Sequence, residues 1–338
     1  MSRARRHHHT PQVYLRNFAD DGLLMVYNRR AQEPPRLIHT RHVAVEMDLY
    51  TVEDADGNQS DIYETGWLQW FDGQIAAILP ILLEPRPQLT TAHRSLISMF
   101  LALQHMRTPY MRDTIANTVD MMLRLEIETQ TRGMSRAEID RFVEEWDPNA
   151  SDSEKAAVRQ VALDPSQPVT LRTEPWIKAM LRHIPDIAEG LEGRHWRVVD
   201  AEGATFLTGD LPVVLDGDRV LAISEAPAVY WPLSPNRMLM LDAPGSSNGR
   251  SFNGSIAPAE TVHYINQLTA AISARHIYWH PETDPTVGIV LPAGAHTNSV
   301  NDIAVADGER FYDVIRREGL LERDDSSPEA ADARTDES

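Results

Sequence analysis

The chain of 338 residues contains no cysteine, only two lysines, and no long uninterrupted apolar run. Without cysteine it can form no disulfide and no thiolate metal site, and it has no cysteine nucleophile. Without about 18 consecutive apolar residues it has no predicted membrane span. The first nine residues are basic but lack an apolar segment, so they do not predict a secretory signal. We therefore expect a cytoplasmic protein.

Positive charge is also scarce, because 32 basic residues face 50 acidic ones and leave a net charge of −18. Phosphate contacts need concentrated positive charge, so the bulk charge argues against non-specific nucleic-acid binding. Residues 321–338 hold seven acids and two arginines with few apolar residues, which predicts a disordered acidic tail. The remaining residues, 1–320, are predicted to form a single domain.

Strand patterns flank a long helical block. Alternating apolar residues predict strands at 23–27 and 36–52, and short strand-like runs follow residue 194. Helical spacing dominates from about 60 to 190, and Pro109 interrupts or restarts it. This order predicts an α+β fold, in which N- and C-terminal segments form a small mixed or antiparallel sheet around a helical insertion. No glycine-rich phosphate-binding motif occurs, so the common nucleotide-binding folds are not expected.

Three consecutive histidines precede Thr10-Pro11, a pair that predicts a helix start with Thr as N-cap and Pro at the first helical position. A helix start favours anions, and a neutral imidazole beside it can act as a general base or a metal ligand. His8 is the candidate for that role. A solvated basic arm and the remnant of a purification tag are the alternatives.

The predicted helix at 91–106 carries polar side chains on an apolar face. Positions spaced four and three residues apart share one face, and they are occupied by His93, Ile97, Phe100, Gln104 and Arg107. A buried guanidinium needs an acidic or anionic partner. Glu64 and Asp210 are the candidate carboxylates. Arg107 is thus either half of a structural ion pair or an anion-binding residue in a cleft, and the polar neighbours favour the cleft.

Two acidic residues stand where they could take part in chemistry. Glu64 shares a predicted helix face with aromatic residues, and burial there could shift its pKa into the range used for acid–base catalysis. Asp210 lies in a Thr-Gly-Asp-Leu-Pro turn after a strand-like run, where it could bind a metal or a substrate hydroxyl. Alternatively, it hydrogen-bonds its own backbone. The motifs of common serine hydrolases and zinc proteases are missing.

Six ordered segments together resemble a bacterial family known as domain of unknown function 4238. The similar segments are His7–Phe18, Glu46–Tyr50, Gln104–Pro109, Thr208–Pro212, Pro232–Pro235 and Asn266–Tyr278. In the fourth segment Gly209 and Leu211 stand where the family usually has Ser and Asn, while Asp210 is kept. The resemblance spans about residues 7 to 280. It supports a common fold and site and implies no established reaction.

Two functions fit these observations. In the first, His8, Glu64, Gln104, Arg107 and Asp210 converge in one cleft and hydrolyse a phosphodiester or nucleotide-like anion. Arginine would stabilise the developing phosphoryl charge, and a divalent metal could bind at His8 and Asp210. In the second, the same residues form a structural polar network in a non-catalytic binding or regulatory module. An open pocket favours the first function and a closed, fully hydrogen-bonded network the second. Nothing in the sequence indicates an oligomeric state.

Overall fold

The computed structural model describes residues 6–31, 33–53, 59–60, 63–146, 150, 152–166, 173–216, 223, 226–242 and 255–293. The chain divides into two compact units, residues 1–115 with 171–297 and residues 116–170 with 298–338. The predicted helical insertion therefore contributes to both units. The predicted acidic tail lies outside the described residues and stays a prediction.

The first unit contains both larger sheets. Its α-helices are α1 (Gln12–Leu15), α2 (Gln69–Leu82), α3 (Thr91–Met106), α7 (Thr173–Glu192) and α8 (Ala259–Ile272). A π-helical turn at Tyr63–Leu68 precedes α2. The strands are β1 (Arg6–His8), β2 (Leu23–Asn28), β3 (Arg36–His39), β4 (Val45–Met47), β5 (Val52–Glu53), β6 (Gln59–Ser60), β7 (His195–Glu202), β8 (Thr208–Gly209), β9 (Val214–Leu215), β10 (Ala228–Ser234), β11 (Arg237–Asp242), β12 (Ser255–Pro258) and β13 (His276–Trp279).

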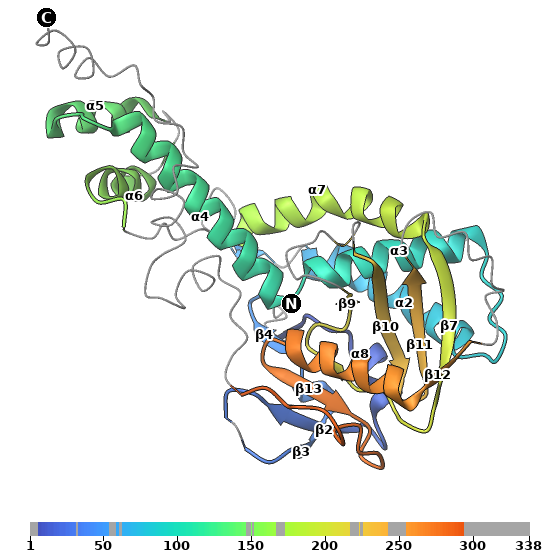
Figure 1. Ribbon diagram of the computed structural model, residues 1–338. Helices are drawn as coiled ribbons and strands as arrows, with labels where there is room; N and C mark the ends of the chain where they lie inside the picture. The colour runs from blue at the N-terminus through green and yellow to red at the C-terminus, as the bar shows by residue number, and fades with distance from the viewer. Residues whose placement is uncertain are drawn as a thin grey trace, which may run out of the picture. The chain divides into compact units, whose positions relative to one another are not determined.

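A five-stranded sheet of order β12-β7-β11-β10-β9 forms the centre of this unit (Figure 1). All its pairs are antiparallel except β12 with β7, so the sheet is mixed. Because side chains alternate between the two faces of a strand, Trp231 and Leu239 enter the main core with helices α2, α3 and α7. Tyr230 and Met238 face the other way and pack with α8.

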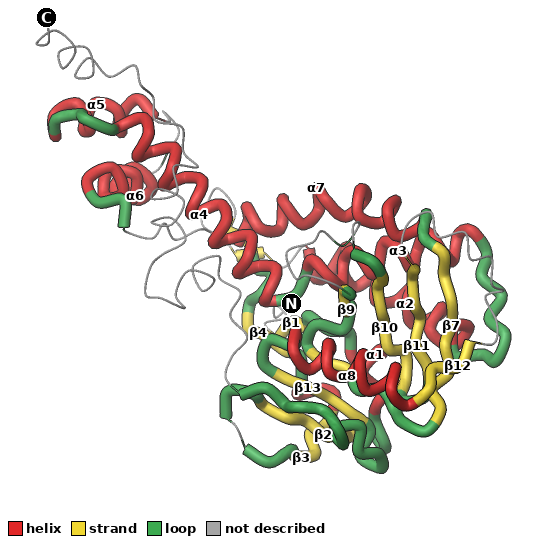
Figure 2. The backbone as a smooth tube through the Cα atoms, in the orientation of Figure 1, coloured by secondary structure: helices red, strands yellow, loops and turns green. Residues whose placement is uncertain are grey.

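A four-stranded antiparallel sheet of order β3-β2-β13-β8 joins distant parts of the chain (Figure 2). Strand β13 lies between β2 from the N-terminal part and β8 from the C-terminal part. Helix α8 contributes Ala270 to a small core with Leu207, Ile277 and Trp279. The predicted α+β class, with a sheet built from both ends of the chain around a helical block, is confirmed.

The N-terminal histidines are held in a third pairing, between β1 and β4. His7 lies opposite Glu46 and His8 opposite Val45 in antiparallel register. The His9 backbone N–H continues the pairing by donating to the Ala44 carbonyl at 3.0 Å. The histidine run is therefore part of the folded unit rather than a solvated arm.

Local signals placed the start of α4 (Pro109–Thr131) correctly and the N-cap of α1 incorrectly. Pro109 begins α4, as its fixed φ favours. At α1 the N-cap is Pro11, whose side chain makes no capping hydrogen bond, so Thr10 is not the N-cap. His93 forms a capping box with Thr90 at the start of α3. This imidazole serves the helix end and not a site around Arg107.

The second unit is helical where it is described. It contains the later part of α4 with α5 (Arg136–Trp146) and α6 (Asp152–Leu163). Its small core consists of Ile127, Ile139, Val143, Val158 and Val161. Exposed ion pairs such as Lys155–Glu144, with 2.9 Å between Nζ and Oε2, join α6 to α5. These pairs contribute little to stability, so the apolar core holds this unit together.

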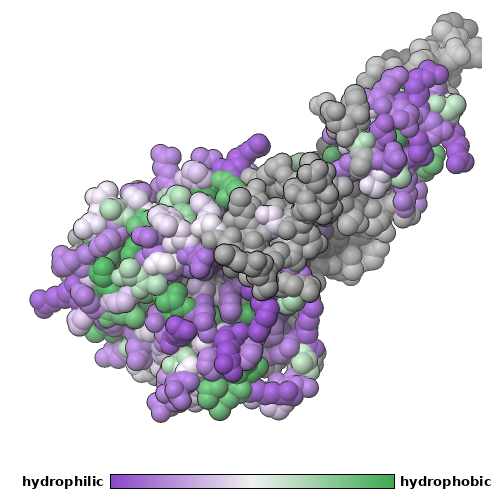
Figure 3. Space-filling model, turned by 180° about the vertical axis from the view of Figure 1, so that it is seen from behind, coloured by the Kyte–Doolittle hydropathy of each residue, from purple (hydrophilic) through white to green (hydrophobic). Residues whose placement is uncertain are grey.

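The visible surface of the first unit is mostly hydrophilic, with hydrophobic residues in small groups (Figure 3). No helix among the described residues is both long and apolar enough to span a membrane.

Candidate functional site

Arg107 lies at the C-terminal end of α3 and is completely buried. Its Nε and Nη2 donate to Oε1 of Gln104 at 3.0 and 2.6 Å, and its Nη1 donates to Oδ1 of Asp72 at 3.0 Å. Gln104 in turn donates from Nε2 to the His9 carbonyl at 2.9 Å. We call Asp72, Gln104 and Arg107 the arginine network. Every nitrogen of its guanidinium has a partner, as a buried charge requires.

The carboxylate beside Arg107 is therefore Asp72 of α2, and Asp210 is not its partner. The side chain of Glu64 lies outside the described residues, so its role stays a prediction. Asp72 is 30% exposed while Arg107 is 1% exposed, so the pair sits at the edge of the core. Tyr50 donates from its hydroxyl to the Arg107 carbonyl at 3.4 Å. These contacts tie the N-terminal strands to the helical layer.

His8 lies close to this network on the half-buried side of β1. Its pKa is lowered by burial and by Arg6, while Asp72 and a backbone contact with Thr40 act in the opposite direction. Its Nε2 is buried and has no hydrogen-bond partner within the described residues. The structure thus brings His8, Gln104 and Arg107 into one neighbourhood. A catalytic or metal-binding role of His8 stays a prediction.

Asp210 is buried where α8 ends and β13 begins. Its carboxylate accepts from the backbone N–H groups of Ala274 at 2.7 Å, Arg275 at 2.7 Å and His276 at 3.0 Å. Burial raises the pKa of Asp210, while nearby His276 and the three N–H donors lower it. With both oxygens occupied in this way, Asp210 fixes the backbone that carries Arg275 and His276.

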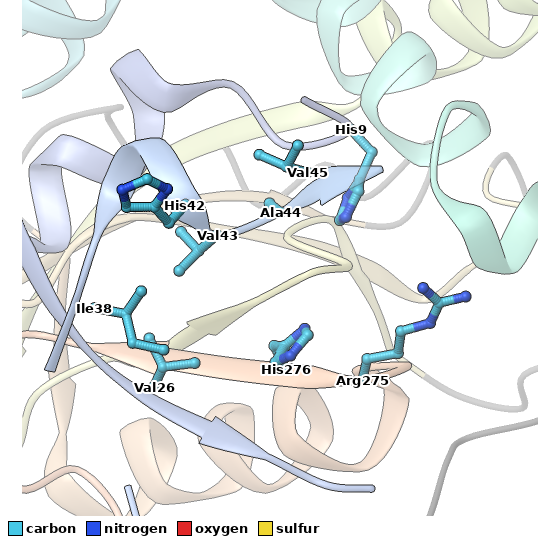
Figure 4. Close-up of a pocket in the computed structure, with 9 residues that line it drawn as sticks. All are labelled: His9, Val26, Ile38, His42, Val43, Ala44, Val45, Arg275 and His276. Atoms are coloured by element: carbon cyan, nitrogen blue, oxygen red, sulfur yellow. The ribbon is translucent and has the colours of Figure 1, made fainter. Parts of the chain in front are cut away.

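A pocket of about 100 Å³ opens next to that fixed segment (Figure 4). Three imidazoles and one guanidinium line it together with aliphatic side chains, and no carboxylate is among its lining residues. The lining consists of His9, Val26, Ile38, His42, Val43, Ala44, Val45, Arg275 and His276. In Figure 4 His9 points into the space from one side, and Arg275 and His276 reach it from the other. We call it the histidine pocket.

The environment favours the neutral form of each pocket histidine. Burial lowers the pKa of His9 well below its usual value, and the charges of Arg107, His276 and Arg275 add to the effect. Burial also lowers the pKa of His276, although Asp210 partly opposes this change. For the exposed His42, desolvation is the largest cause of a lowered pKa, and the charges of Arg41 and Arg6 contribute less. An anion in the pocket would shift all three in the opposite direction.

The backbone of Ala44, which lines the histidine pocket, is strained. Ala44 adopts a φ of 52°, in the left-handed region that non-glycine residues rarely occupy. Its carbonyl accepts from the His9 backbone, and its side chain lines the pocket. Such strain often accompanies functional sites, because the surrounding structure has to hold the residue in place.

His9 joins the pocket to the arginine network, since its carbonyl accepts from Gln104 while its ring faces Arg275 and His276. The predicted residues and the pocket are therefore neighbours, but the pocket is lined by His9 rather than His8. Sequence reasoning missed His42, Arg275 and His276. The Arg-His pair just before the last predicted strand was the available signal.

Within the part of the chain that the structure describes, no group of three or more histidine, aspartate or glutamate residues is arranged to hold a metal ion. A divalent metal at His8 and Asp210 stays a prediction. Three backbone N–H groups already donate to the Asp210 carboxylate, and they would compete with a metal ion for its oxygens.

Comparison with known families identifies the chain at the level of its family. A family model described as "Protein of unknown function (DUF4238)" matches residues 6–283, which include every described residue of the pocket and the arginine network. The chain belongs to this family. No curated protein and no solved structure gives a match. For this member of the family, the function therefore has to be argued from the site itself.

Proposed function

We propose that the histidine pocket hydrolyses a phosphodiester bond of a nucleotide-like anion. The observation that carries the proposal is a pocket lined by three imidazoles and one guanidinium with no carboxylate among its lining side chains. Imidazoles can both accept and donate protons near neutral pH. A guanidinium can hold two phosphate oxygens in its planar fork. This residue set matches the charge and the proton transfers of phosphodiester hydrolysis.

The pocket supplies each element of that reaction. Arg275 binds a phosphate oxygen and stabilises the charge that develops on it. Neutral His9 accepts a proton from a water molecule, whose oxygen attacks phosphorus. Protonated His276 donates its proton to the leaving ester oxygen as the phosphorus–oxygen bond breaks. Burial lowers the pKa of His276, whereas Asp210 raises it. A bound phosphate raises it further, so binding of the substrate is what protonates this imidazole.

Two buried contacts act as positioning elements in this scheme. The Asp210 carboxylate fixes the backbone of residues 274–276, and Gln104 holds the His9 carbonyl. Both walls of the pocket are thereby anchored before a ligand arrives. Preorganised groups of this kind stabilise a transition state without having to reorient during the reaction.

The test uses bis(4-nitrophenyl) phosphate, a small chromogenic diester. We expect wild-type protein to release 4-nitrophenolate, with at least about a hundredfold lower kcat in His9→Gln and in His276→Gln. The matched control is His183→Gln, at an exposed histidine of α7 that does not line the pocket. Equal rates in wild type and both pocket variants would refute the proposal.

The second candidate is a non-catalytic binding module. It is favoured by the complete hydrogen bonding of Arg107, because a closed network is what a purely structural polar cluster requires. This alternative predicts that inorganic phosphate binds and that no diester is hydrolysed. A phosphate titration followed by calorimetry, run beside the hydrolysis assay, separates the two functions.

A further inference from the structure

Three exposed arginines lie next to histidines that line the pocket. Arg6 and Arg41 both contact His42, with 3.3 Å from Arg6 Nη2 to Nδ1 and 2.9 Å from Arg41 Nε to Nε2. On the opposite wall Arg275 lines the pocket. Arg30 lies near enough to lower the pKa of His276. We call Arg6, Arg30 and Arg41 the basic rim, and all three are exposed.

The contacts of His42 are unfavourable without an additional partner. A neutral imidazole has one donor and one acceptor nitrogen, so it can accept from only one of the two guanidiniums. The other guanidinium faces an N–H group or another positive charge. Arg6 also donates to the Arg41 carbonyl at 3.1 Å, which keeps the two like charges together. Such an arrangement is stabilised when an anion lies between them.

Two half-buried arginines elsewhere in the same unit are neutralised by carboxylates. Arg197 makes a forked contact with Asp242 at 2.8 Å through both Nε and Nη2, and Arg237 reaches Asp200 at 2.7 Å. Among the described residues, by contrast, no ion pair joins a rim arginine to a carboxylate. In a chain of net charge −18, acidic partners are abundant. What distinguishes the rim is therefore that its guanidiniums, unpaired with any described carboxylate, lie next to the histidines that line the pocket.

We infer that the substrate is an oligonucleotide strand, with one phosphate in the histidine pocket and neighbouring phosphates on the basic rim. This inference rests on the proposed function, which it extends from a small diester to a polymer. The pocket of about 100 Å³ has room for a phosphate group. A strand that continues beyond that phosphate passes the rim arginines beside His42 and His276. A local basic surface of this kind can bind a strand although the bulk charge is negative.

The experiment measures binding of a fluorescent single-stranded octamer of deoxythymidylate by anisotropy, with unlabelled thymidine monophosphate as competitor. We expect the octamer to bind at least tenfold more tightly than the monophosphate. Because each strand phosphate contact contributes about −0.7 to the slope of log K against log salt, we expect a slope of about −2 to −3. A slope near zero, or equal affinities for octamer and monophosphate, would overturn the inference.

The variant pair Arg6→Gln with Arg41→Gln tests the rim directly. We expect at least a tenfold loss of octamer affinity and a salt slope that is less steep by about 1.4, because two phosphate contacts disappear. The control is Arg86→Gln with Arg182→Gln, two exposed arginines that do not line the pocket and that change the net charge by the same amount. Equal losses in both pairs would mean that bulk charge, and not the rim, binds the strand.

Failure of this inference is distinguishable from failure of the proposed function. The small chromogenic diester carries a single phosphate and offers no neighbouring phosphate to the rim arginines, so its hydrolysis by wild-type protein tests the pocket without strand contacts. Rim-dependent octamer binding without any diester hydrolysis would keep the strand-binding surface and remove the catalytic role. Diester hydrolysis without rim-dependent binding would keep the catalytic role of the pocket and remove the strand-binding surface.

Discussion

The arginine network and the histidine pocket meet at His9, and their polar groups are arranged in opposite ways. In the network, each guanidinium nitrogen of Arg107 already has an acceptor on Gln104 or Asp72. In the pocket, the rings of His9 and His276 face a space shared with a guanidinium. The first arrangement satisfies its charges within the protein. The second leaves positive and titratable groups facing an open space.

This difference separates structural from functional polar residues better than burial does. Arg107 and His9 are both buried, and both lie within one short hydrogen-bonded path through Gln104. What distinguishes them is where their polar atoms point. A buried polar group with all its partners stabilises one fold, whereas a group that faces an open pocket is available to a ligand.

The largest effect is expected from breaking the network. Arg107→Lys keeps the charge but cannot reproduce the planar fork that contacts Gln104 and Asp72. We expect the free energy of unfolding to fall by about 3 kcal/mol, measured by urea denaturation, because a broken buried pair leaves polar groups unpaired. Arg112→Lys, on a quarter-exposed arginine paired with Glu46, should cost less than about 1 kcal/mol. A stable Arg107→Lys protein that no longer binds phosphate would instead assign Arg107 to the site.

A smaller effect on the free energy of unfolding is expected from protonating the pocket histidines. Because the folded-state pKa of His9 is lowered, the unfolded chain binds more protons once the pH falls below about 6.5. The free energy of unfolding should therefore be constant above that pH and decrease below it, by up to about 1.4 kcal/mol per pH unit for each such histidine. Urea denaturation between pH 5 and 8 measures this slope. If His9→Gln shows the same slope as wild type, His9 is not a titrating group of the pocket.

The smallest effect is expected outside both regions. Deleting Asp324 to Ser338 should leave the melting temperature unchanged, because this acidic segment has too little apolar area to offset the roughly 1–2 kcal/mol per residue that backbone ordering costs. Thermal unfolding of the truncated and full-length chains gives the comparison. A decrease of several degrees would show that the segment packs on one of the two units.

The sequence was sufficient to predict the features that depend on local patterns. Alternation and helical spacing predicted the α+β class, and Pro109 marked the start of a helix. The spacing of Gln104 and Arg107 on one helix face predicted their proximity, which their hydrogen bonds confirm. Each of these features depends on residues a few positions apart, so one segment contains all the information.

Features that depend on long-range pairing could not be predicted. Asp72 and Arg107 are 35 residues apart, and nothing in either segment indicates that α2 places this aspartate beside the end of α3. The choice between His8 and His9 depends on which face of β1 meets the pocket, and a shift of one residue reverses that face. Asp210 and residues 274–276 meet only because β13 pairs with β8.

The pocket walls come from residues 9 and 276, almost opposite ends of the described chain, and this separation determines when the pocket can form. Contacts between such distant residues require nearly the whole first unit to be synthesised before they can be made. A ribosome-bound chain that ends before β13 holds His9 and the basic rim but lacks Arg275 and His276. Any cleavage by this pocket would therefore be absent from nascent chains and would begin only after the last strand has entered its sheet.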